Sequence, residues 1–162
     1  MVFPGQGSQS VGMQADLATA YPIVQQTYEE ASESLGYDLW ELIQNGPAEK
    51  LAETVVTQPA MLAAGTAAYR VWLAAGGDQP QQVSGHSLGE YSALVAAEAL
   101  SFSDAMTIVI RRSELMQRAV PAGSGGMAAV LGLDDDAVIA ACDEASSIGI
   151  AEPVNFNSPG QV

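Results

Sequence analysis

The chain has 162 residues, of which 48% are hydrophobic and 15% charged, a composition typical of a folded protein rather than a disordered one. Its formal net charge of −14, with only five lysines and arginines, excludes a broad nucleic-acid-binding surface. One cysteine and one histidine exclude an internal disulfide and a Cys/His zinc site. No apolar run approaches the ~20 residues of a membrane span, and no signal peptide is recognisable, so we expect a cytoplasmic protein without a membrane partner.

The first part of the chain is predicted to hold a strand end, a glycine loop and three helices. Gly36 marks the end of the first helix, a D-x-x-E capping box at Asp38 opens the second, and Gly46-Pro47 ends it. In chain order, the strand end covers residues 2–3, the loop 4–7, and the helices 22–35, 38–45 and 48–53.

The middle of the chain predicts three further helices and one strand. One helix starts at Thr57-Gln58-Pro59, with proline near its first position, and its apolar stripe extends to Trp72 and Leu73 before Gly76-Gly77. A short strand is expected over residues 81–84 and a helix over 88–99. Ser101 caps a last helix that runs to about residue 119.

The remainder predicts a linker and a second, smaller module. Residues 121–126 are rich in glycine, and strand, helix and strand are expected over 127–133, 134–145 and 148–156. We therefore expect one unit over 1–122 and another over 123–162. A single βαβ unit cannot cover both faces of its sheet, so we expect its apolar residues to be partly exposed, including Val130, Leu131, Val138 and Ile139.

The segment GHSLGEY at residues 85–91 carries the first chemical signal. Gly85-His86-Ser87-Leu88-Gly89 fits G-x-S-x-G between a predicted strand and a predicted helix, the context of a nucleophile elbow. Such a turn exposes the serine hydroxyl at a helix N-terminus, where free N–H groups stabilise an oxyanion. The alternative is a glycine-bounded turn with an idle serine.

His86 is the only histidine, and it directly precedes the candidate nucleophile Ser87. Neighbouring residues in an extended turn point to different sides, and catalytic triads recruit their histidine from elsewhere in the chain. We therefore weigh a role as general base against a role in lining the site, and favour the second.

Arg112 occupies the i+7 position of an apolar stripe in the predicted helix that Ser101 caps, together with Ile108, Leu115 and Met116. A guanidinium on such a face needs a carboxylate or phosphate partner. That partner is either an internal Asp or Glu or the free carboxylate of an acyl substrate. Met116, one turn further on, is a candidate for the same site.

The loop PGQGSQ at residues 4–9 is not a dinucleotide-binding fingerprint, because Ser10 stands where G-x-G-x-x-G requires its third glycine. The glycines on either side of Gln6 instead allow its backbone N–H to approach a ligand closely.

Together these segments resemble the malonyl-CoA:acyl carrier protein transacylase family of type II fatty acid synthesis. The matching segments are FPGQGSQ at 3–9, QPA at 58–60, GHSLGEY at 85–91, GGMAA at 125–129 and NFNSPGQV at 155–162. The resemblance implies an α/β fold, with a partial α/β-hydrolase-like large subdomain and the start of an inserted ferredoxin-like small subdomain. The chain resembles roughly the N-terminal half of such an enzyme.

The resemblance also implies a role for each matched residue. Ser87 is expected to carry the malonyl group as an ester, and the N–H groups of Gln6 and Leu88 to form the oxyanion hole. Arg112 is expected to hold the malonyl carboxylate, Gln58 to line the acyl site, and His86 to stand beside the nucleophile as part of the same site. The family's general-base histidine belongs to a later segment, so residues 1–162 are expected to hold only part of the active site.

The expected substrates are malonyl-CoA, a coenzyme A thioester, and the phosphopantetheine thiol of acyl carrier protein, with no tightly bound cofactor and no metal. Acyl carrier protein is itself acidic, so basic residues such as Arg111 or Arg118 are candidates for local contacts with it.

Alternative functions are the acyltransferase domain of a polyketide synthase, a malonate decarboxylase subunit, a serine esterase and a non-catalytic binding protein. The segment at 125–129 favours the fatty-acid enzyme, and Arg112 argues against a plain esterase.

Overall fold

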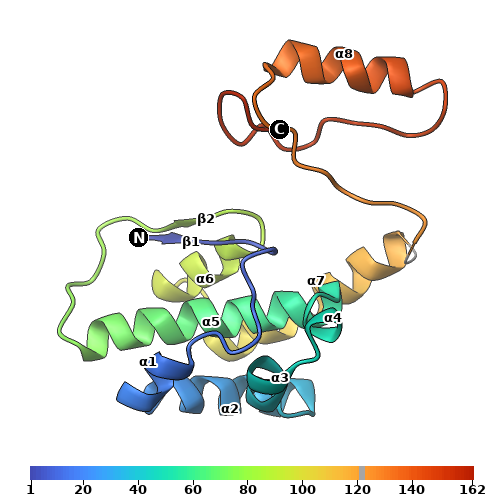
Figure 1. The fold of residues 1–162 in the computed structure, drawn as a ribbon. Coiled ribbons are helices and arrows are strands. Elements are labelled where there is room, and N and C mark those ends of the chain that lie inside the picture. The colour runs from blue at the N-terminus through green and yellow to red at the C-terminus, as the bar shows by residue number, and fades with distance from the viewer. Residues whose placement is uncertain (121–122) are drawn as a thin grey trace. The chain divides into compact units, whose positions relative to one another are not determined.

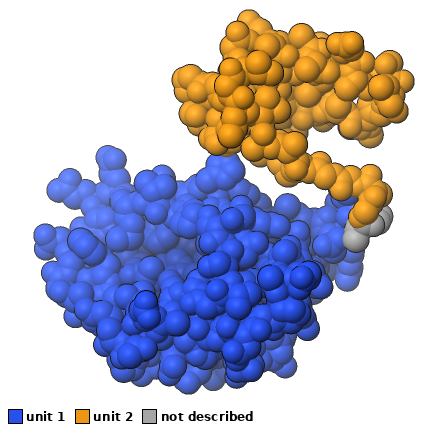
Figure 2. Space-filling view, in the orientation of Figure 1, with its two compact units in different colours: residues 1–121 blue, residues 122–162 orange. Residues whose placement is uncertain are grey.

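A computed structural model describes residues 1–120 and 123–162, so the first two residues of the expected linker, 121 and 122, lie outside the described residues. The chain divides into two compact units, residues 1–121 and residues 122–162 (Figure 2). Each unit is described by itself.

The first unit is mostly helical and contains a two-stranded parallel sheet (Figure 1). In that sheet Val2 pairs with Ser84 and Phe3 with Gly85. The elements in chain order are β1 (Val2–Phe3), α1 (Ala15–Ala20), α2 (Ile23–Leu35), α3 (Leu39–Asn45), α4 (Ala48–Leu51), α5 (Thr54–Ala74), β2 (Ser84–Gly85), α6 (Gly89–Ala96) and α7 (Phe102–Ala119).

Helix α5 is the centre of this unit and packs against α2, α6 and α7. It is buried on all sides along most of its length, because alanines such as Ala60, Ala63 and Ala67 let the neighbouring helices approach closely. The prediction that the apolar stripe of this helix extends to Trp72 and Leu73 is therefore wrong, because both residues are exposed.

The start of α5 also differs from the expectation. The helix begins at Thr54, so Pro59 lies inside it rather than near its first position. Pro59 has no N–H, so it leaves the carbonyl of Val55 without its helical donor. The segment is nevertheless held in place, because the buried Thr57 hydroxyl donates to the Leu51 carbonyl at 2.6 Å.

Arg70 of α5 links three helices of the unit. Its Nη1 donates to Glu30 Oε2 at 2.8 Å and to Thr27 Oγ1 at 3.0 Å, both on α2. Its guanidinium carbon lies 5.0 Å from the centre of the Phe102 ring on α7, within the range of a cation–π contact. These contacts fix α7 and α2 relative to α5.

The predicted helix ends are largely confirmed, because they depend on local side-chain bonds. Asp38 accepts from the N–H of Glu41 at 2.9 Å, Ser101 accepts from Asp104 N–H at 3.1 Å, and Gly36 ends α2 with φ of 75°. Helix α1 was not predicted. It follows Gln14, which has φ of 64° and is held by the Tyr28 hydroxyl and the Ala64 carbonyl.

Two element boundaries next to the serine motif are corrected. The strand expected over 81–84 is β2 at Ser84–Gly85, because only these residues lie opposite the short β1. The helix expected over 88–99 ends at Ala96, and Glu98 follows it with φ of 58°.

The second unit contains one helix, α8 (Asp135–Ala145), capped by Asp134 as predicted. The prediction of strands over 127–133 and 148–156 is wrong, because among the described residues neither segment has the continuous pairing with a neighbour that a strand requires. Instead, the end of the chain runs antiparallel to residues 130–132: Val130 and Val162 exchange backbone hydrogen bonds of 2.8 and 3.2 Å, and Leu131 bridges Gln161.

The expected exposure of apolar residues in this unit is confirmed in part. Leu131 and Ile139 are exposed, whereas Val138 is buried. None of the helices in the described ranges 1–120 and 123–162 is both long and apolar enough to span a membrane.

Candidate active site

The turn between β2 and α6 holds Ser87 in a strained conformation. Ser87 has φ of 51°, a region that favours glycine, and its side chain is exposed. The Gly89 N–H donates to the His86 carbonyl at 2.8 Å, which closes the turn directly before α6. This is the strand–turn–helix geometry that the G-x-S-x-G pattern predicts.

Gly85 and Gly89 let three backbone segments meet at this turn. A Cβ at Gly85 would lie 2.0 Å from the Gly89 carbonyl, and a Cβ at Gly89 would lie 2.3 Å from the carbonyl oxygen of Phe3. Both distances are shorter than any real Cβ contact, and the opposing atoms are backbone. Only glycine therefore fits at either position.

The loop that carries Gln6 packs against the same turn. A Cβ at Gly5 would lie 2.9 Å from the His86 carbonyl oxygen, so the two segments are in close contact. The loop is held by a 2.8 Å bond from the Gly7 N–H to Gln9 Oε1 and a 3.3 Å bond from Gln6 Nε2 to Thr54 Oγ1. Within the described ranges, the backbone N–H groups of Gln6 and Leu88 have no acceptor.

Arg112 of α7 reaches the serine directly. Its Nη2 donates to Ser87 Oγ at 2.9 Å, and its Nη1 donates to Gln58 Oε1. The guanidinium carbon also lies 5.9 Å from the centre of the Tyr91 ring. In the part of the chain that the structure describes, ion pairs join Arg70 and Arg111 to glutamates, but none involves Arg112. The hypothesis of an internal carboxylate partner for Arg112 finds no support there.

The position of Arg112 on α7 differs from the predicted stripe. The helix buries Met106, Val109 and Ser113, whereas Ile108 and Leu115 are exposed. Arg112 therefore lies at the edge of the buried face, where its head group reaches the partly open turn at Ser87.

Gln58 and Met116 complete one hydrogen-bonded network with Arg112 and Ser87. Gln58 is fully buried, and its Nε2 donates to the Sδ atom of Met116 at 3.2 Å. Met116 is 45% exposed. The structure thus brings together Ser87, Arg112, Gln58 and Met116 from the turn, α5 and α7.

His86 lies beside this network without joining it. Its side chain is exposed, and across residues 1–120 and 123–162 no hydrogen bond connects it to Ser87. The geometry therefore offers no support for His86 as the general base. Tyr91, Gln9 and Thr54 were not predicted to contribute, although Tyr91 stands in the GHSLGEY segment, one helical turn after Ser87.

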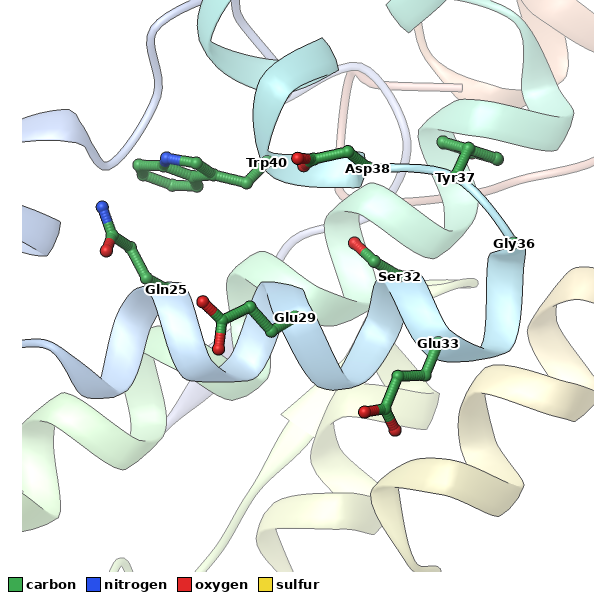
Figure 3. Close-up of a pocket in the computed structure, with 8 residues that line it drawn as sticks. All are labelled: Gln25, Glu29, Ser32, Glu33, Gly36, Tyr37, Asp38 and Trp40. Atoms are coloured by element: carbon green, nitrogen blue, oxygen red, sulfur yellow. The ribbon is translucent and has the colours of Figure 1, made fainter.

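A hollow of about 510 Å³ lies away from the serine, against α2 and the start of α3. Figure 3 shows Gln25, Glu29 and Ser32 following one another along the side of α2 that faces Trp40. No predicted site residue lines it. Nor does any group of three or more His, Cys, Asp or Glu suited to holding a metal ion occur among the described residues.

The fold and the serine turn together define an acyltransferase architecture, and comparison with known proteins gives the family. Residues 1–160 match the family described as "Acyl transferase domain", and the chain belongs to this family. This finding agrees with the resemblance in the sequence.

Relatives of known name support the same family assignment. The chain is 59% identical over 161 residues to the malonyl CoA-acyl carrier protein transacylase of Escherichia coli, a match covering 99% of the chain and 52% of the relative. It is 45% identical over 162 residues to the protein of that name from Bacillus subtilis, covering 99% and 51%. The chain spans about half the length of the curated relatives it matches.

Solved structures give the same result. An acyl carrier protein S-malonyltransferase from Vibrio cholerae superposes with a TM-score of 0.90 at 58% identity, covering 99% of this chain and 53% of that one. A malonyl-transacylase solved in complex with a type II PKS acyl-carrier protein gives a TM-score of 0.94 at 57% identity, covering 100% and 52%. The fold is therefore the acyltransferase fold.

The contact between Gly89 and Phe3 predicts a large cost for a small side chain. Gly89→Ala should lower the free energy of unfolding by about 3 kcal/mol, because the clash with the Phe3 carbonyl outweighs the roughly 1 kcal/mol gained from helix propensity. Gly126→Ala is the matched control, since a Cβ there has no neighbour within 4 Å. Urea unfolding measures both variants, and equal stability would show that the backbone contact is absent.

The positive φ of Ser87 predicts that glycine is the more stable residue at this position. Ser87→Gly should be more stable than Ser87→Ala by about 1 kcal/mol, because both variants lose the hydroxyl but only alanine retains the strain of φ near 51°. Thermal unfolding of the two variants tests this. An alanine variant as stable as the glycine variant would exclude a strained turn.

Proposed function

We propose that these residues form the acyl-loading part of a malonyl-CoA:acyl carrier protein transacylase. Such an enzyme moves malonyl from coenzyme A to the phosphopantetheine thiol of acyl carrier protein in fatty acid synthesis. The observation that carries the proposal is the 2.9 Å hydrogen bond from Arg112 Nη2 to Ser87 Oγ. The same guanidinium has no carboxylate partner among the described residues. A serine beside such an arginine suits an acyl group that ends in a carboxylate.

In the proposed reaction, Ser87 Oγ attacks the thioester carbonyl of malonyl-CoA. The hydroxyl proton passes to a general base, which the resemblance assigns to a histidine in a later segment. The oxyanion is stabilised by the free N–H groups of Gln6 and Leu88, and its collapse breaks the C–S bond to release coenzyme A. The phosphopantetheine thiol then gives its proton to the same base and attacks the malonyl-serine ester. The new C–S bond forms, the ester C–O bond breaks, and Ser87 Oγ takes the proton back, which completes a ping-pong cycle.

Arg112 is proposed to select the acyl group. Malonyl places a carboxylate two carbons from the ester carbonyl, so the guanidinium next to Ser87 Oγ is within its reach. Gln58, His86 and Met116 are assigned to the surroundings of this acyl site. No tightly bound cofactor is required, because both substrates are thioesters or thiols that bring their own activated group.

The proposal extends to the organisation of the protein. We assign residues 1–122 to an α/β-hydrolase-like large subdomain and residues 123–162 to the first part of a ferredoxin-like insert. The protein is expected to act in the cytoplasm on acyl carrier protein. A role in polyketide synthesis is the second candidate, favoured by the similar malonyl-transacylase that was solved with a type II PKS acyl-carrier protein. Comparing transfer rates to acyl carrier proteins of the two pathways distinguishes these candidates.

Ser87 is expected to be the residue that carries malonyl. In the natural protein that contains these residues, brief incubation with malonyl-CoA should add one malonyl group at Ser87, detected by mass spectrometry of its peptides. Ser87→Ala should remain unlabelled. A malonyl group on this variant, or on another residue of the unchanged protein, would overturn the assignment.

Arg112→Ala should impair malonyl loading much more than acetyl loading. The charge-assisted bond to the substrate carboxylate is worth about 1.5–3 kcal/mol, which corresponds to a roughly 10- to 150-fold loss in kcat/KM for malonyl-CoA. Arg111→Ala is the matched control, because Arg111 lies on the same helix and pairs with Glu114 at 3.0 Å. An equal loss for both acyl groups would mean that Arg112 is structural.

A further inference from the structure

The network behind Arg112 has a feature that the expected lining roles of Gln58 and Met116 do not explain. Gln58 is fully buried, and both ends of its amide are occupied by protein atoms, Arg112 at the oxygen and Met116 at the nitrogen. Because the side chain is fully buried, its amide presents no accessible polar group to a substrate. Its influence on an acyl group must therefore pass through Arg112.

We propose that Gln58 and Met116 are positioning residues that hold the Arg112 guanidinium against Ser87 and thereby set the preference for carboxylate-bearing acyl groups. This inference rests on the proposed function. Gln58 contacts Arg112 directly, whereas Met116 acts through Gln58, because it determines the orientation of the Gln58 amide.

The argument for Met116 follows from donor and acceptor chemistry. The oxygen and the NH2 group of a glutamine amide are nearly equal in size, so packing alone does not select between its two orientations. A guanidinium has only donors, and a thioether sulfur has only an acceptor. The observed orientation satisfies both neighbours of Gln58. The reversed amide would set NH2 against the guanidinium and oxygen against the sulfur, with both hydrogen bonds lost.

The placement on two helices makes this a brace for Arg112. Arg112 and Met116 stand one turn apart on α7, and Gln58 comes from α5, the buried centre of the unit. The fixed amide therefore contacts two successive turns of α7. The Tyr91 ring of α6 lies 5.9 Å from the guanidinium carbon. An arginine side chain held in this way loses less conformational freedom on binding a carboxylate than an unrestrained arginine would. The bracing therefore strengthens the proposed preference for malonyl over acetyl groups.

The first test is Met116→Leu in the natural protein, with Ser87 loading measured by rapid quench and mass spectrometry. Leucine keeps the apolar bulk but removes the acceptor, so the Gln58 amide is free to reverse. We expect the KM for malonyl-CoA to rise roughly three- to tenfold, as for loss of one net hydrogen bond, with kcat and acetyl-CoA loading changed less than twofold. Met106→Leu is the matched control, because Met106 lies buried on the same helix outside the network and should leave all three values unchanged.

The second test is Gln58→Glu, which keeps the shape of the side chain. A carboxylate there would pair with the guanidinium and occupy it, so malonyl loading should fall further than in Met116→Leu while acetyl loading is largely retained. The comparison of the two acyl groups remains informative even if a substitution lowers the melting temperature. A purely structural defect would reduce malonyl loading and acetyl loading equally, and that result would contradict the proposal.

The outcomes separate the two levels of inference. If the unchanged protein does not load malonyl on Ser87, the proposed function is wrong. If it prefers malonyl to acetyl, and both variants keep the same ratio of the two, the positioning role of Gln58 and Met116 is wrong and the proposed function stands.

Discussion

The first unit depends on a backbone contact that only glycine permits. Because Gly85 and Gly89 lack side chains, α6 begins directly against the two strands, with its first turn near the Phe3 carbonyl. The chain then has three residues in which to reverse from strand to helix, and Ser87 takes a positive φ as a consequence. The same short turn leaves the Leu88 N–H without an acceptor in the described structure, close to the loop of Gln6. The strain, the exposed hydroxyl and the unpaired Leu88 N–H therefore have one cause.

The second constraint is the burial of α5, which gives the exposed serine turn a rigid support. Its small side chains let α2, α6 and α7 pack closely around it, and the Arg70 contacts to α2 and Phe102 hold that arrangement. Gln58 is therefore presented from a buried helix, and Arg112 from the helix packed against it. A site built on packed helices keeps the spacing between arginine and serine better than one built on loops would.

The parts of this structure that were predictable from sequence are those determined by local bonds. The caps at Asp38, Ser101 and Asp134 and the turn around Ser87 depend on residues a few positions apart, so their patterns are visible in the chain. The prediction of strands over 127–133 and 148–156 failed because an apolar segment does not reveal its pairing partner. The observed pairing joins residues 130–132 to the last residues of the chain instead. Arg112 was singled out from its place on a predicted apolar helix face, although Ile108 and Leu115 of that face are exposed. Its contact with Gln58 was not predictable, because no local pattern connects residues on two different helices.

The choice of an amide beside Arg112 is significant in a chain with 19 acidic residues against five basic ones. A glutamate in place of Gln58 would hold the guanidinium more strongly, but it would also neutralise it and compete with any incoming carboxylate. A glutamine oxygen accepts the same hydrogen bond and leaves the full positive charge available. Tyr91 acts in the same sense, since an aromatic face attracts a cation without neutralising it. Gln58 and Tyr91, the two described neighbours of the guanidinium besides Ser87, are therefore both uncharged. This arrangement is the one expected where the charge of the arginine is reserved for a ligand.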